Sequence, residues 1–401
     1  MDGTSDSRST RRSFIGTGAA ALIGSTLLAG CSGSTGDGGT GEPTPTAETT
    51  DTPSPGSPEG DTSYTVSMEP VGDVTFESVP ERWIAYDGAF ADMAVALGQV
   101  EGMTGIGYAD RYYTYVYDEI DGLAVDRSVL TEGELLGDTI PKEPFYQLDN
   151  DVHLMDPQML INWFGWSPED VEEITSNVAP FFGNLIFRRE DDWHDYRYYT
   201  LYEAFEKVAQ LFQEQERYDA FREYHDEFIA EVQTELPSAD DRPNVLLVYA
   251  GSDEPTQFSP YRLNDQGTSK KQWHDLGVSD ALAGTGISGL STSDRGKIDY
   301  ETMLEIDPDV IMVRGHERQS AEEFRDTVLA FMQDHEVASE LTAVRNGRVY
   351  RGGFLHQGPI QNFFLTERAA QQLFPEVFGD VTGDRQLFDR QRIADIVAGN
   401  V

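Results

Sequence analysis

The chain has 401 residues and a formal net charge of −42, from 71 acidic and 29 basic residues. This charge excludes nucleic acid and anionic lipid head groups as partners for most of the surface, because the acids are spread along the whole sequence. Such a composition, with few lysines, is typical of proteins from high-salt habitats, where screening limits charge interactions to a few ångströms. An acidic secreted protein from an ordinary habitat is the alternative. The length predicts two or three domains.

The first 31 residues have the features of an export signal. Arg11 and Arg12 lie in the sequence Thr-Arg-Arg-Ser-Phe-Ile, which resembles a twin-arginine signal. The apolar run at 19–29 is shorter than the roughly 20 residues that a membrane span needs. It leads to Leu-Ala-Gly-Cys, which resembles a lipobox, so Cys31, the only cysteine, is predicted to carry a lipid after cleavage. An uncleaved anchor with a free thiol is the alternative.

Residues 32–63 form a second segment with its own composition. Gly, Thr, Ser and Pro dominate it and apolar side chains are almost absent, so it cannot bury a core. We expect a disordered tether that holds the folded body near the extracellular face of the cell membrane through the lipid on Cys31.

The region 64–195 is predicted to be an α/β lobe with a parallel sheet, because strands and helices alternate. The expected strands lie at 82–86, 103–107 and 159–163, and the expected helices at 89–97 and 168–176. Ligands bind beyond the carboxyl ends of such strands. Aromatic and arginine residues follow these ends, and we expect a ligand cleft there, the alternative being that they cover the core. These residues are Tyr86, Tyr108, Arg111, Tyr112, Trp163 and Trp166.

The stretch 198–236 has no Gly or Pro and repeats apolar residues at helical spacing. We therefore assign 196–236 as one long connecting helix between two lobes. A bend near Gln213 stays open, because polar residues interrupt the apolar stripe there. A rigid helix between lobes predicts only a small tilt when a ligand binds.

The region 242–401 is predicted to be a second α/β lobe. Strands are expected at 244–249, 309–314 and 348–351, and a helix at 359–374. Here too, binding candidates follow the strands, and one tryptophan is a further candidate for the cleft wall. These residues are Tyr249, Arg314, His316, Phe354, His356 and Trp273.

Two segments, 149–161 and 299–311, share a pattern that suggests similar architecture in the two lobes. Each is interpreted as an acidic helix start, an Asp-Pro stop and a strand, because Pro lacks an N–H and crowds the preceding turn.

The sequence lacks the motifs of common catalytic sites, such as His-Glu-x-x-His, Gly-x-Ser-x-Gly or a Walker-type Lys. Residues 284–289 match Gly-x-Gly-x-x-Gly but follow an expected helix at 278–282 instead of a strand, so we expect a simple turn. A direct metal site from His153, His316 and His356 is an alternative, although no two histidines lie four residues apart. We expect neither an enzyme nor a cofactor.

Several short motifs, by their order and spacing, resemble the substrate-binding proteins of ABC importers for iron–siderophores, haem and corrinoids. Besides the lipobox, they lie at 79–82, 96–98, 298–311 and 344–350. The resemblance covers 66–398 and implies two α/β lobes, one rigid connecting helix and a ligand between the lobes. The segments 357–362 and 387–392 look most like the iron(III) branch.

The resemblance implies a monomeric receptor that delivers a ferric siderophore, an iron(III) chelate, to an ABC permease and its ATPase. Ferric siderophores are often anionic, and Arg111 or Arg314 would pair with them. A corrinoid or haem, with His356 as axial ligand, is the alternative cargo. A membrane-anchored extracellular enzyme is the alternative of another class.

The family docks on its permease through one acid on each lobe. Glu301 matches that position in the second lobe. In the first lobe the aligned residue is Asn150, so the neighbouring Asp149 and Asp151 are the docking candidates.

Overall fold

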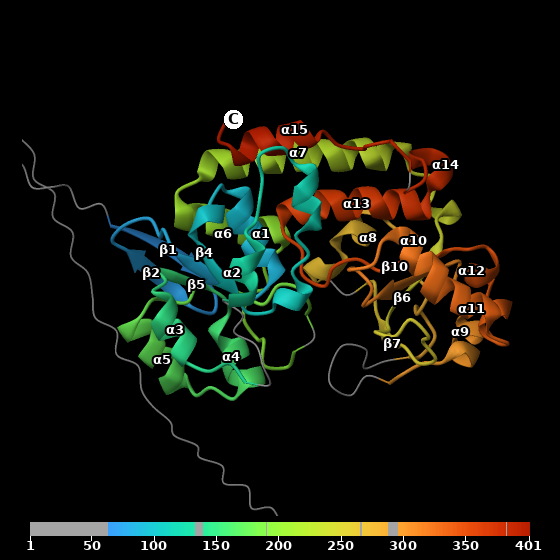
Figure 1. Cartoon of the computed structure of the whole chain (residues 1–401), viewed down its shortest axis with the longest axis horizontal. Coiled ribbons are helices and arrows are strands. Elements are labelled where there is room, and N and C mark those ends of the chain that lie inside the picture. Colours follow the sequence, from blue (N-terminus) through green and yellow to red (C-terminus); the bar gives the residue numbers. More distant parts are fainter. Residues whose placement is uncertain (1–62, 133–138, 190, 265–266, 288–295, 382) are drawn as a thin grey trace, which may run out of the picture. The chain divides into compact units, whose positions relative to one another are not determined.

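The computed structural model describes residues 63–132, 139–189, 191–264, 267–287, 296–381 and 383–401. The predicted export signal, with Arg11, Arg12 and Cys31, lies outside the described residues, as does the predicted tether apart from its last residue. In the described part, no helix combines the length and apolar character that crossing a membrane requires. The folded part is α/β, with two lobes that each contain a parallel sheet (Figure 1).

The first lobe begins with an antiparallel hairpin of β1 (Tyr64–Met68) and β2 (Gly72–Phe76). A three-stranded parallel sheet follows, with β3 (Trp83–Ala85) between β4 (Met103–Ile106) and β5 (Val152–Leu154). The predicted strands at 82–86 and 103–107 are therefore confirmed. The predicted helix at 89–97 is α1 (Gly88–Ala96), and the one at 168–176 is α5 (Pro168–Asn177). The short helices of this lobe are η1 (Val100–Gly102), η2 (Ala109–Arg111), η3 (Tyr115–Glu119), α2 (Arg127–Glu132) and α3 (Glu143–Leu148).

The predicted strand at 159–163 is wrong, because these residues belong to helix α4 (Pro157–Phe164). Asp156 is the N-cap, and its carboxylate accepts the backbone N–H of Gln158 at 2.9 Å. Pro is favoured at the first helical position, where its missing N–H leaves no bond unmade. Here, therefore, the Asp-Pro pair starts a helix, and the strand before it is β5.

The connecting segment forms two helices, α6 (Leu201–Phe212) and α7 (Gln215–Glu235), instead of one. Gln213 breaks the helix with a left-handed backbone (φ 56°), so the bend left open by the sequence lies there. Thr200 and Glu203 form a capping box that starts α6. Helix α6 packs on β1 and α1, whereas α7 reaches α8 and α13.

The second lobe has a five-stranded sheet in the order β10-β9-β6-β7, with β8 also paired to β6. The strands are β6 (Asn244–Tyr249), β7 (Ser259–Tyr261), β8 (Ser279–Asp280), β9 (Val310–Arg314) and β10 (Val349–Arg351). Only β7 is antiparallel among these pairs. The three predicted strands are confirmed, but the expected helix at 278–282 is wrong, because β8 lies there.

Helices surround this sheet and extend from it to the first lobe. They are η4 (Ala239–Asp241), η5 (Thr268–Lys270), α8 (Lys271–Leu276), α9 (Tyr300–Ile306), α10 (Ala321–Phe324), the π-helical η6 (Arg325–Leu329), α11 (Ala330–Asp334), η7 (Ala338–Glu340), α12 (Thr342–Arg345), α13 (Pro359–Leu373), α14 (Pro375–Phe378) and α15 (Arg390–Val397). The predicted helix at 359–374 is α13.

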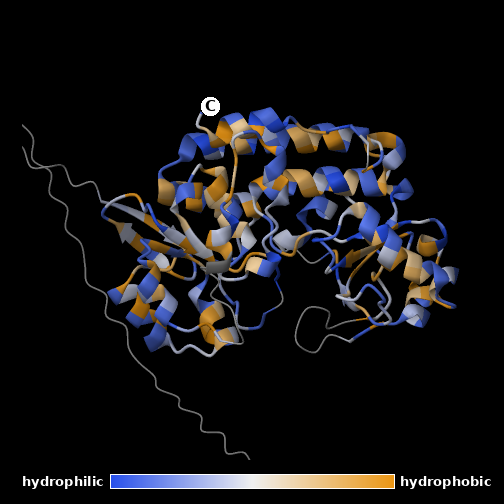
Figure 2. Cartoon of the chain, viewed as in Figure 1, coloured by the Kyte–Doolittle hydropathy of each residue, from blue (hydrophilic) through white to orange (hydrophobic). Residues whose placement is uncertain are grey.

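Helix α13 joins the two lobes as much as α7 does. It packs against α1 and α6 of the first lobe and against α8 of the second (Figure 1). Phe363 of α13 stacks on Phe228 of α7 with ring centroids 5.1 Å apart. One apolar core cluster therefore runs through both lobes. The outer helices α7 and α15 alternate hydrophilic and hydrophobic residues, as helices with one buried face do (Figure 2).

Candidate functional site

A pocket opens at the carboxyl ends of the second lobe's strands and is closed by a loop of the first lobe. We call it the interlobe pocket. Its cavity is small, about 60 Å³, within about 410 Å³ of space outside protein atoms that includes open solvent. The first lobe contributes Arg111 and Tyr113, and the second contributes Tyr249, Tyr261, Arg314, Gly315, Gly353 and Leu355.

Arg314, the last residue of β9, is held in place by the main chain of the second lobe. Its guanidinium donates to the carbonyl oxygens of Ser269, Gly352 and Phe354. It also lies 5.1 Å from the ring centroid of Tyr261, a cation–π contact. The charge is therefore buried and fixed at the pocket wall.

Gly315, the next residue, lets the chain turn away from the sheet. Its φ of 109° lies in the left-handed region, and a Cβ there would come within 2.5 Å of the carbonyl oxygen of Ala250. Only glycine fits at this position, so the turn sets the shape of the pocket beside Arg314.

The first lobe's side of the pocket is aromatic and positively charged. Arg111 is exposed, and its guanidinium lies 4.2 Å from the ring centroid of Tyr108. Tyr113 stacks on buried Phe354 of the second lobe, with ring centroids 4.7 Å apart. Phe354 thus supports a wall of the pocket from behind.

No carboxylate lines the interlobe pocket among the described residues. A buried acid, Glu317, lies beneath it and forms an ion pair with Arg368 at 2.9 Å. Its carboxylate also accepts the backbone N–H of Gly353 at 2.8 Å. Burial alone would raise the pKa of Glu317, but the neighbouring Arg368 and Arg351 hold it below the usual value. Glu317 is therefore ionised and neutralised, and the net charge of the pocket wall is positive.

Three of the twelve binding candidates from the sequence line this pocket: Arg111, Tyr249 and Arg314. Tyr249 is 45 % exposed. Three more candidates support the wall: Tyr108 under Arg111, Phe354 under Tyr113, and Trp273, whose ring lies 5.4 Å from the Arg314 guanidinium.

Sequence reasoning missed five lining residues: Tyr113, Tyr261, Gly315, Gly353 and Leu355. The aromatic run at 108–113 could have indicated Tyr113, and the position of Gly315 directly after a strand could have indicated a turn. Tyr261 lies in the polar segment that follows the strand predicted at 244–249, and the structure places it in β7, a strand of three residues.

Two candidates, Tyr86 and His356, are buried where the lobes meet. The Nδ1 atom of His356 lies 3.1 Å from a carboxylate oxygen of Asp87. Asp87 is also the N-cap of α1 and accepts the backbone N–H of Ala89 at 2.9 Å. Burial alone would raise the pKa of Asp87, but His356 and these N–H donors lower it. His356 is 2 % exposed and does not line the interlobe pocket.

The other four candidates also lie outside the interlobe pocket. Tyr112 is buried and its hydroxyl is 2.8 Å from that of Tyr117. Trp166 lies in the first lobe's core and donates its indole N–H to the carbonyl oxygen of Ile140 at 2.7 Å.

Trp163 packs edge-on against Trp193, with ring centroids 5.6 Å apart. His316 is buried, which lowers its pKa, and its Nδ1 is 3.5 Å from a carboxylate oxygen of Asp253.

The structure aligns the helix-to-strand segments of the two lobes differently from the sequence, and this alignment decides which acids are equivalent. Helices α3 and α9 each end at a left-handed aspartate, Asp149 (φ 50°) and Asp307 (φ 46°). In both lobes the next strand begins three residues later. This match aligns Glu301 with Glu143, and both are exposed in the first turn of their helices.

The alignment on Asp-Pro is therefore wrong, because it pairs a helix start with a helix end. Docking by Asp149 or Asp151 stays a prediction, and Asp151 also has a local role. Its carboxylate accepts the backbone N–H groups of Glu81 and Arg82, each at 2.9 Å.

A metal site built from side chains finds no support within the described ranges. No group of three or more His, Cys, Asp or Glu residues there could hold a metal ion. His153 is buried between Phe145 and Phe181, and burial lowers its pKa to about 3. It belongs to the first lobe's core and does not line the interlobe pocket.

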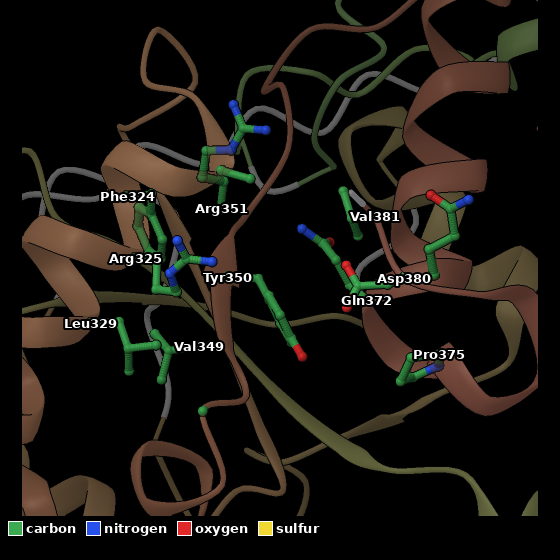
Figure 3. Close-up of a pocket in the computed structure, with 13 residues that line it drawn as sticks. Phe324, Arg325, Leu329, Val349, Tyr350, Arg351, Gln372, Pro375, Asp380 and Val381 are labelled. Carbon is green, nitrogen blue, oxygen red and sulfur yellow. The ribbon is translucent and has the colours of Figure 1, made fainter. Parts of the chain in front are cut away.

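A further pocket, with a cavity of about 230 Å³, lies within the second lobe (Figure 3). Tyr350 of β10 stands between side chains of α10 and η6, such as Arg325, and those near α13 and α14, such as Gln372 and Asp380. It takes no residue from the first lobe. We therefore do not regard it as the equivalent of a site between lobes.

Comparisons with known proteins agree with this architecture. A family described as "Periplasmic binding protein" matches residues 147–354, just over half of the chain. No curated protein matches the sequence.

Solved structures share the fold at low identity. The petrobactin-binding protein YclQ of Bacillus subtilis is 13 % identical, covers 78 % of this chain and 99 % of its own, and has a TM-score of 0.55. The iron uptake ABC transporter substrate-binding protein PiuA of Streptococcus pneumoniae is 16 % identical, covers 77 % and 98 %, and also scores 0.55. CeuE of Helicobacter pylori with Ni(II) bound is 16 % identical, covers 79 % and 90 %, and scores 0.51. At these identities the likeness establishes the fold and not the ligand.

Proposed function

The chain belongs to the periplasmic binding protein family, and on this premise we propose that it is the solute receptor of an ABC importer for an anionic ferric siderophore. The family consists of binding proteins, so the protein is a receptor and not an enzyme. The proposed ligand site is the interlobe pocket, with Arg111 and Arg314 as the residues that recognise charge.

The observation that carries this proposal is the charge of the pocket. The whole chain has 71 acidic and 29 basic residues, yet the pocket lining has two arginines and, in the part of the chain that the structure describes, no carboxylate. A guanidinium presents a planar set of donors that matches carboxylate and catecholate oxygens. A concentration of positive charge against such a background supports an anionic ligand.

The aromatic lining supports a ligand with a flat or partly apolar group that enters the pocket. Tyr113, Tyr249 and Tyr261 offer ring faces for packing and hydroxyl groups for hydrogen bonds. A siderophore already coordinates its iron, so the receptor needs no metal ligands of its own. Two proteins of the same fold are named for petrobactin binding and for iron uptake, which is consistent with this ligand class.

We further propose that Glu143 and Glu301 are the docking acids, since they occupy equivalent exposed positions on the two lobes. In this scheme the receptor is a monomer, held on the extracellular face of the membrane by a lipid on Cys31. It would hand its ligand to the permease, which its ATPase drives. The proposed folded regions are 64–195 and 242–401, with 196–236 as the connection.

Haem or a corrinoid is the second candidate cargo. The three tyrosines favour haem over a corrinoid, because a phenolate can be an axial ligand of haem iron. An axial histidine is less well supported, since His316 and His356 are buried and paired with acids.

Fluorescence titration in high salt tests the proposal. Trp273 lies under Arg314, so its emission should be quenched by an iron chelate in the interlobe pocket. The titrants are ferric catecholate and hydroxamate siderophores, haem, cyanocobalamin and free Fe(III). We expect saturable binding of a ferric siderophore, weakened about tenfold or more by Arg111→Gln through loss of a charged hydrogen bond.

Arg345→Gln is the matched control, because Arg345 is an exposed arginine of α12 outside the pocket. Saturation by haem or corrinoid alone would overturn the siderophore proposal. Equal loss of affinity in both variants would show that Arg111 acts only through general surface charge.

A further inference from the structure

The pocket drawn in Figure 3 lies at an edge of the second lobe's sheet. We call it the edge pocket, because its strand β10 is the last in the order β10-β9-β6-β7 and pairs with β9 alone among the described strands. Helices α10 and η6 line it on one side of β10, and the end of α13, the start of α14 and the loop after α14 line it on the other (Figure 3). Its cavity of about 230 Å³ shares no lining residue with the interlobe pocket.

Most of the wall of the edge pocket is apolar. Phe324, Leu329 and Val349 line it and belong to a core cluster of the second lobe. The ring of Tyr350 stands between the two sides (Figure 3). An apolar cavity of about 150 Å³ holds benzene. The edge pocket is larger, so it has room for a single ring with a small substituent.

The helix on one side of the pocket is irregular where it borders the cavity. The residues of η6 are π-helical, and Ala330 donates its backbone N–H to the carbonyl oxygen of Arg325, five residues earlier. Such turns are rare and occur frequently at functional sites. Arg325 and Leu329, the first and last residues of this turn, both line the pocket. The position of the turn therefore agrees with a ligand site here.

Gln372, in the last turn of α13, supplies a side-chain amide that makes no hydrogen bond within the described part of the chain. The residue is 6 % exposed, and its amide nitrogen and oxygen both keep some accessible surface. The side chain lines the pocket across from β10, next to Tyr350 (Figure 3). The neighbouring Gln371 differs, because its amide nitrogen donates to the carbonyl oxygen of Arg385 at 2.8 Å. A molecule in the pocket can therefore reach one free donor and one free acceptor on Gln372.

The charged groups of the lining do not select a charged ligand. The guanidinium of Arg351 donates to the carbonyl oxygen of Gln319. Arg325 is exposed and lies 3.4 Å from a carboxylate oxygen of Asp326. Asp380 is also exposed, so salt screens its charge. The free amide thus favours a neutral ligand that both donates and accepts.

We propose that the edge pocket binds a small neutral molecule that combines an apolar ring with an amide, the amide having its N–H and carbonyl oxygen on the same side. The N–H of each amide donates to the carbonyl oxygen of the other, so that ligand and Gln372 form a closed pair. The ring of the ligand packs against Tyr350 and the apolar side chains of α10 and η6. A carboxylate has no N–H to donate and an ammonium has no acceptor, so neither completes both bonds.

Isothermal titration with benzamide in high salt tests the proposal, with N,N-dimethylbenzamide and benzoate as comparison probes. We expect saturable binding of benzamide with a dissociation constant of about 1 mM, which is usual for so small a ligand. Dimethylbenzamide has no N–H and benzoate has only acceptors, so each should bind about fivefold more weakly or worse, the effect of one lost neutral hydrogen bond. No saturable binding of benzamide at tens of millimolar, or equal binding of either comparison probe, overturns the proposal.

Gln372→Met removes the amide with little change of size. It should weaken benzamide binding about fivefold or more and abolish the preference for benzamide over dimethylbenzamide. Gln391→Met is the matched control, because Gln391 is an exposed glutamine of α15 outside the pocket. Its affinity for benzamide should equal that of the wild type. Unchanged affinity in Gln372→Met, or an equal loss in both variants, overturns the proposed site.

Ala321→Leu tests the place of binding without changing a hydrogen bond. Ala321 is the first residue of α10, half-buried and in the lining, so a larger side chain there fills part of the cavity. Benzamide binding should be lost while the protein stays folded, and unchanged affinity overturns the site. Arg111→Gln, in the interlobe pocket, should bind benzamide as the wild type does. A loss there would place benzamide in the interlobe pocket and would also overturn the proposal.

Discussion

Asp92, in α1 of the first lobe, accepts the backbone N–H of Gln361, in the first turn of α13, at 3.1 Å. Both residues are fully buried. The N-cap of α13 is Gly358, which has no side chain to accept these N–H groups, so Asp92 caps the helix from the other lobe. The hydroxyl of Tyr117 also donates to Asp92. One buried carboxyl group therefore bonds to both lobes at their junction.

The first prediction concerns pH and Asp92. Burial raises its pKa to about 7, against the opposing effect of the Tyr117 and backbone donors. Because the folded-state pKa is above the unfolded one, the stability it contributes is complete below about pH 4 and is lost as the pH rises through about 7. Asp92→Asn cannot ionise and still accepts the N–H groups. As the pH rises from about 4 to about 7, the free energy of unfolding should therefore decrease less in Asp92→Asn than in the wild type. The difference between the two decreases should be a few kcal/mol.

Urea denaturation at constant high salt measures this difference. Asp156, whose pKa burial raises to about 6, should account for part of the slope that remains. Asp240→Asn, at an exposed position of η4, is the control and should follow the wild type. Parallel curves for Asp92→Asn and the wild type would contradict the prediction.

The second prediction concerns the close approach of α13 to α1. A Cβ on Gly358 would lie 2.5 Å from the side chain of Asp92 and 2.7 Å from the carbonyl oxygen of Ala89. Gly358→Ala should therefore destabilise the protein by about 1–3 kcal/mol through overpacking. Gly296→Ala is the control, because nothing lies within 4 Å of its added Cβ. Denaturation curves compare the two, and equal stability would show that the helices separate without cost.

The sequence predicted the larger strands because they are continuous apolar runs. Strand β6 is one such run, and its predicted bounds match those observed. Strand β5 has only three residues and was missed, while the apolar run after it belongs to α4. The Asp-Pro pair at 156–157 was misread because Asp caps helix starts while Pro is found at both helix starts and ends. Only the neighbours in space decide which applies.

The site was predictable where it depended on strand ends. Arg111 follows β4 of the first lobe's sheet and Arg314 ends β9 of the second lobe's sheet, so each lies at the carboxyl ends of its own sheet, and the packing of the two lobes brings them to one pocket. Burial was not predictable in the same way. Trp166 and Tyr249 are both aromatic residues at or after the ends of expected strands. Trp166 nevertheless packs in a core, whereas Tyr249 is exposed. Tertiary packing makes that difference, and no local pattern reports it.

The third prediction concerns the break between α6 and α7. Gln213 has a φ of 56° and is exposed, so its side chain adds strain and little packing. Gln213→Gly should stabilise the protein by about 0.5–1 kcal/mol, because glycine adopts this conformation freely. Gln210→Gly, within α6, should destabilise it by about 1 kcal/mol. Thermal unfolding measures the change of stability in both variants. A change with the same sign at the two positions would contradict the inference that the backbone is strained at Gln213.

The fourth prediction concerns the ion pair beneath the interlobe pocket. Glu317 bonds to Arg368 at 2.9 Å, and Arg368 donates to the hydroxyl of Tyr115 in the first lobe at 3.1 Å. Glu317→Gln leaves a buried guanidinium without its counter-charge, so it should cost about 3–5 kcal/mol of stability. The double variant with Arg368→Met removes both charges and should recover most of this loss. Denaturation of the single and double variants measures the difference.

The same change should strengthen the binding of an anion above the pair. Without the negative charge of Glu317, the positive potential from Arg368 reaches the pocket wall, so Glu317→Gln should lower the dissociation constant for an anionic chelate severalfold at a temperature where it is folded. Glu340→Gln, which breaks an exposed pair with Arg345, is the control and should change stability by less than about 1 kcal/mol and affinity not at all. If stability falls but affinity also falls, the pair acts by positioning Tyr115 and Gly353 and not through its charge.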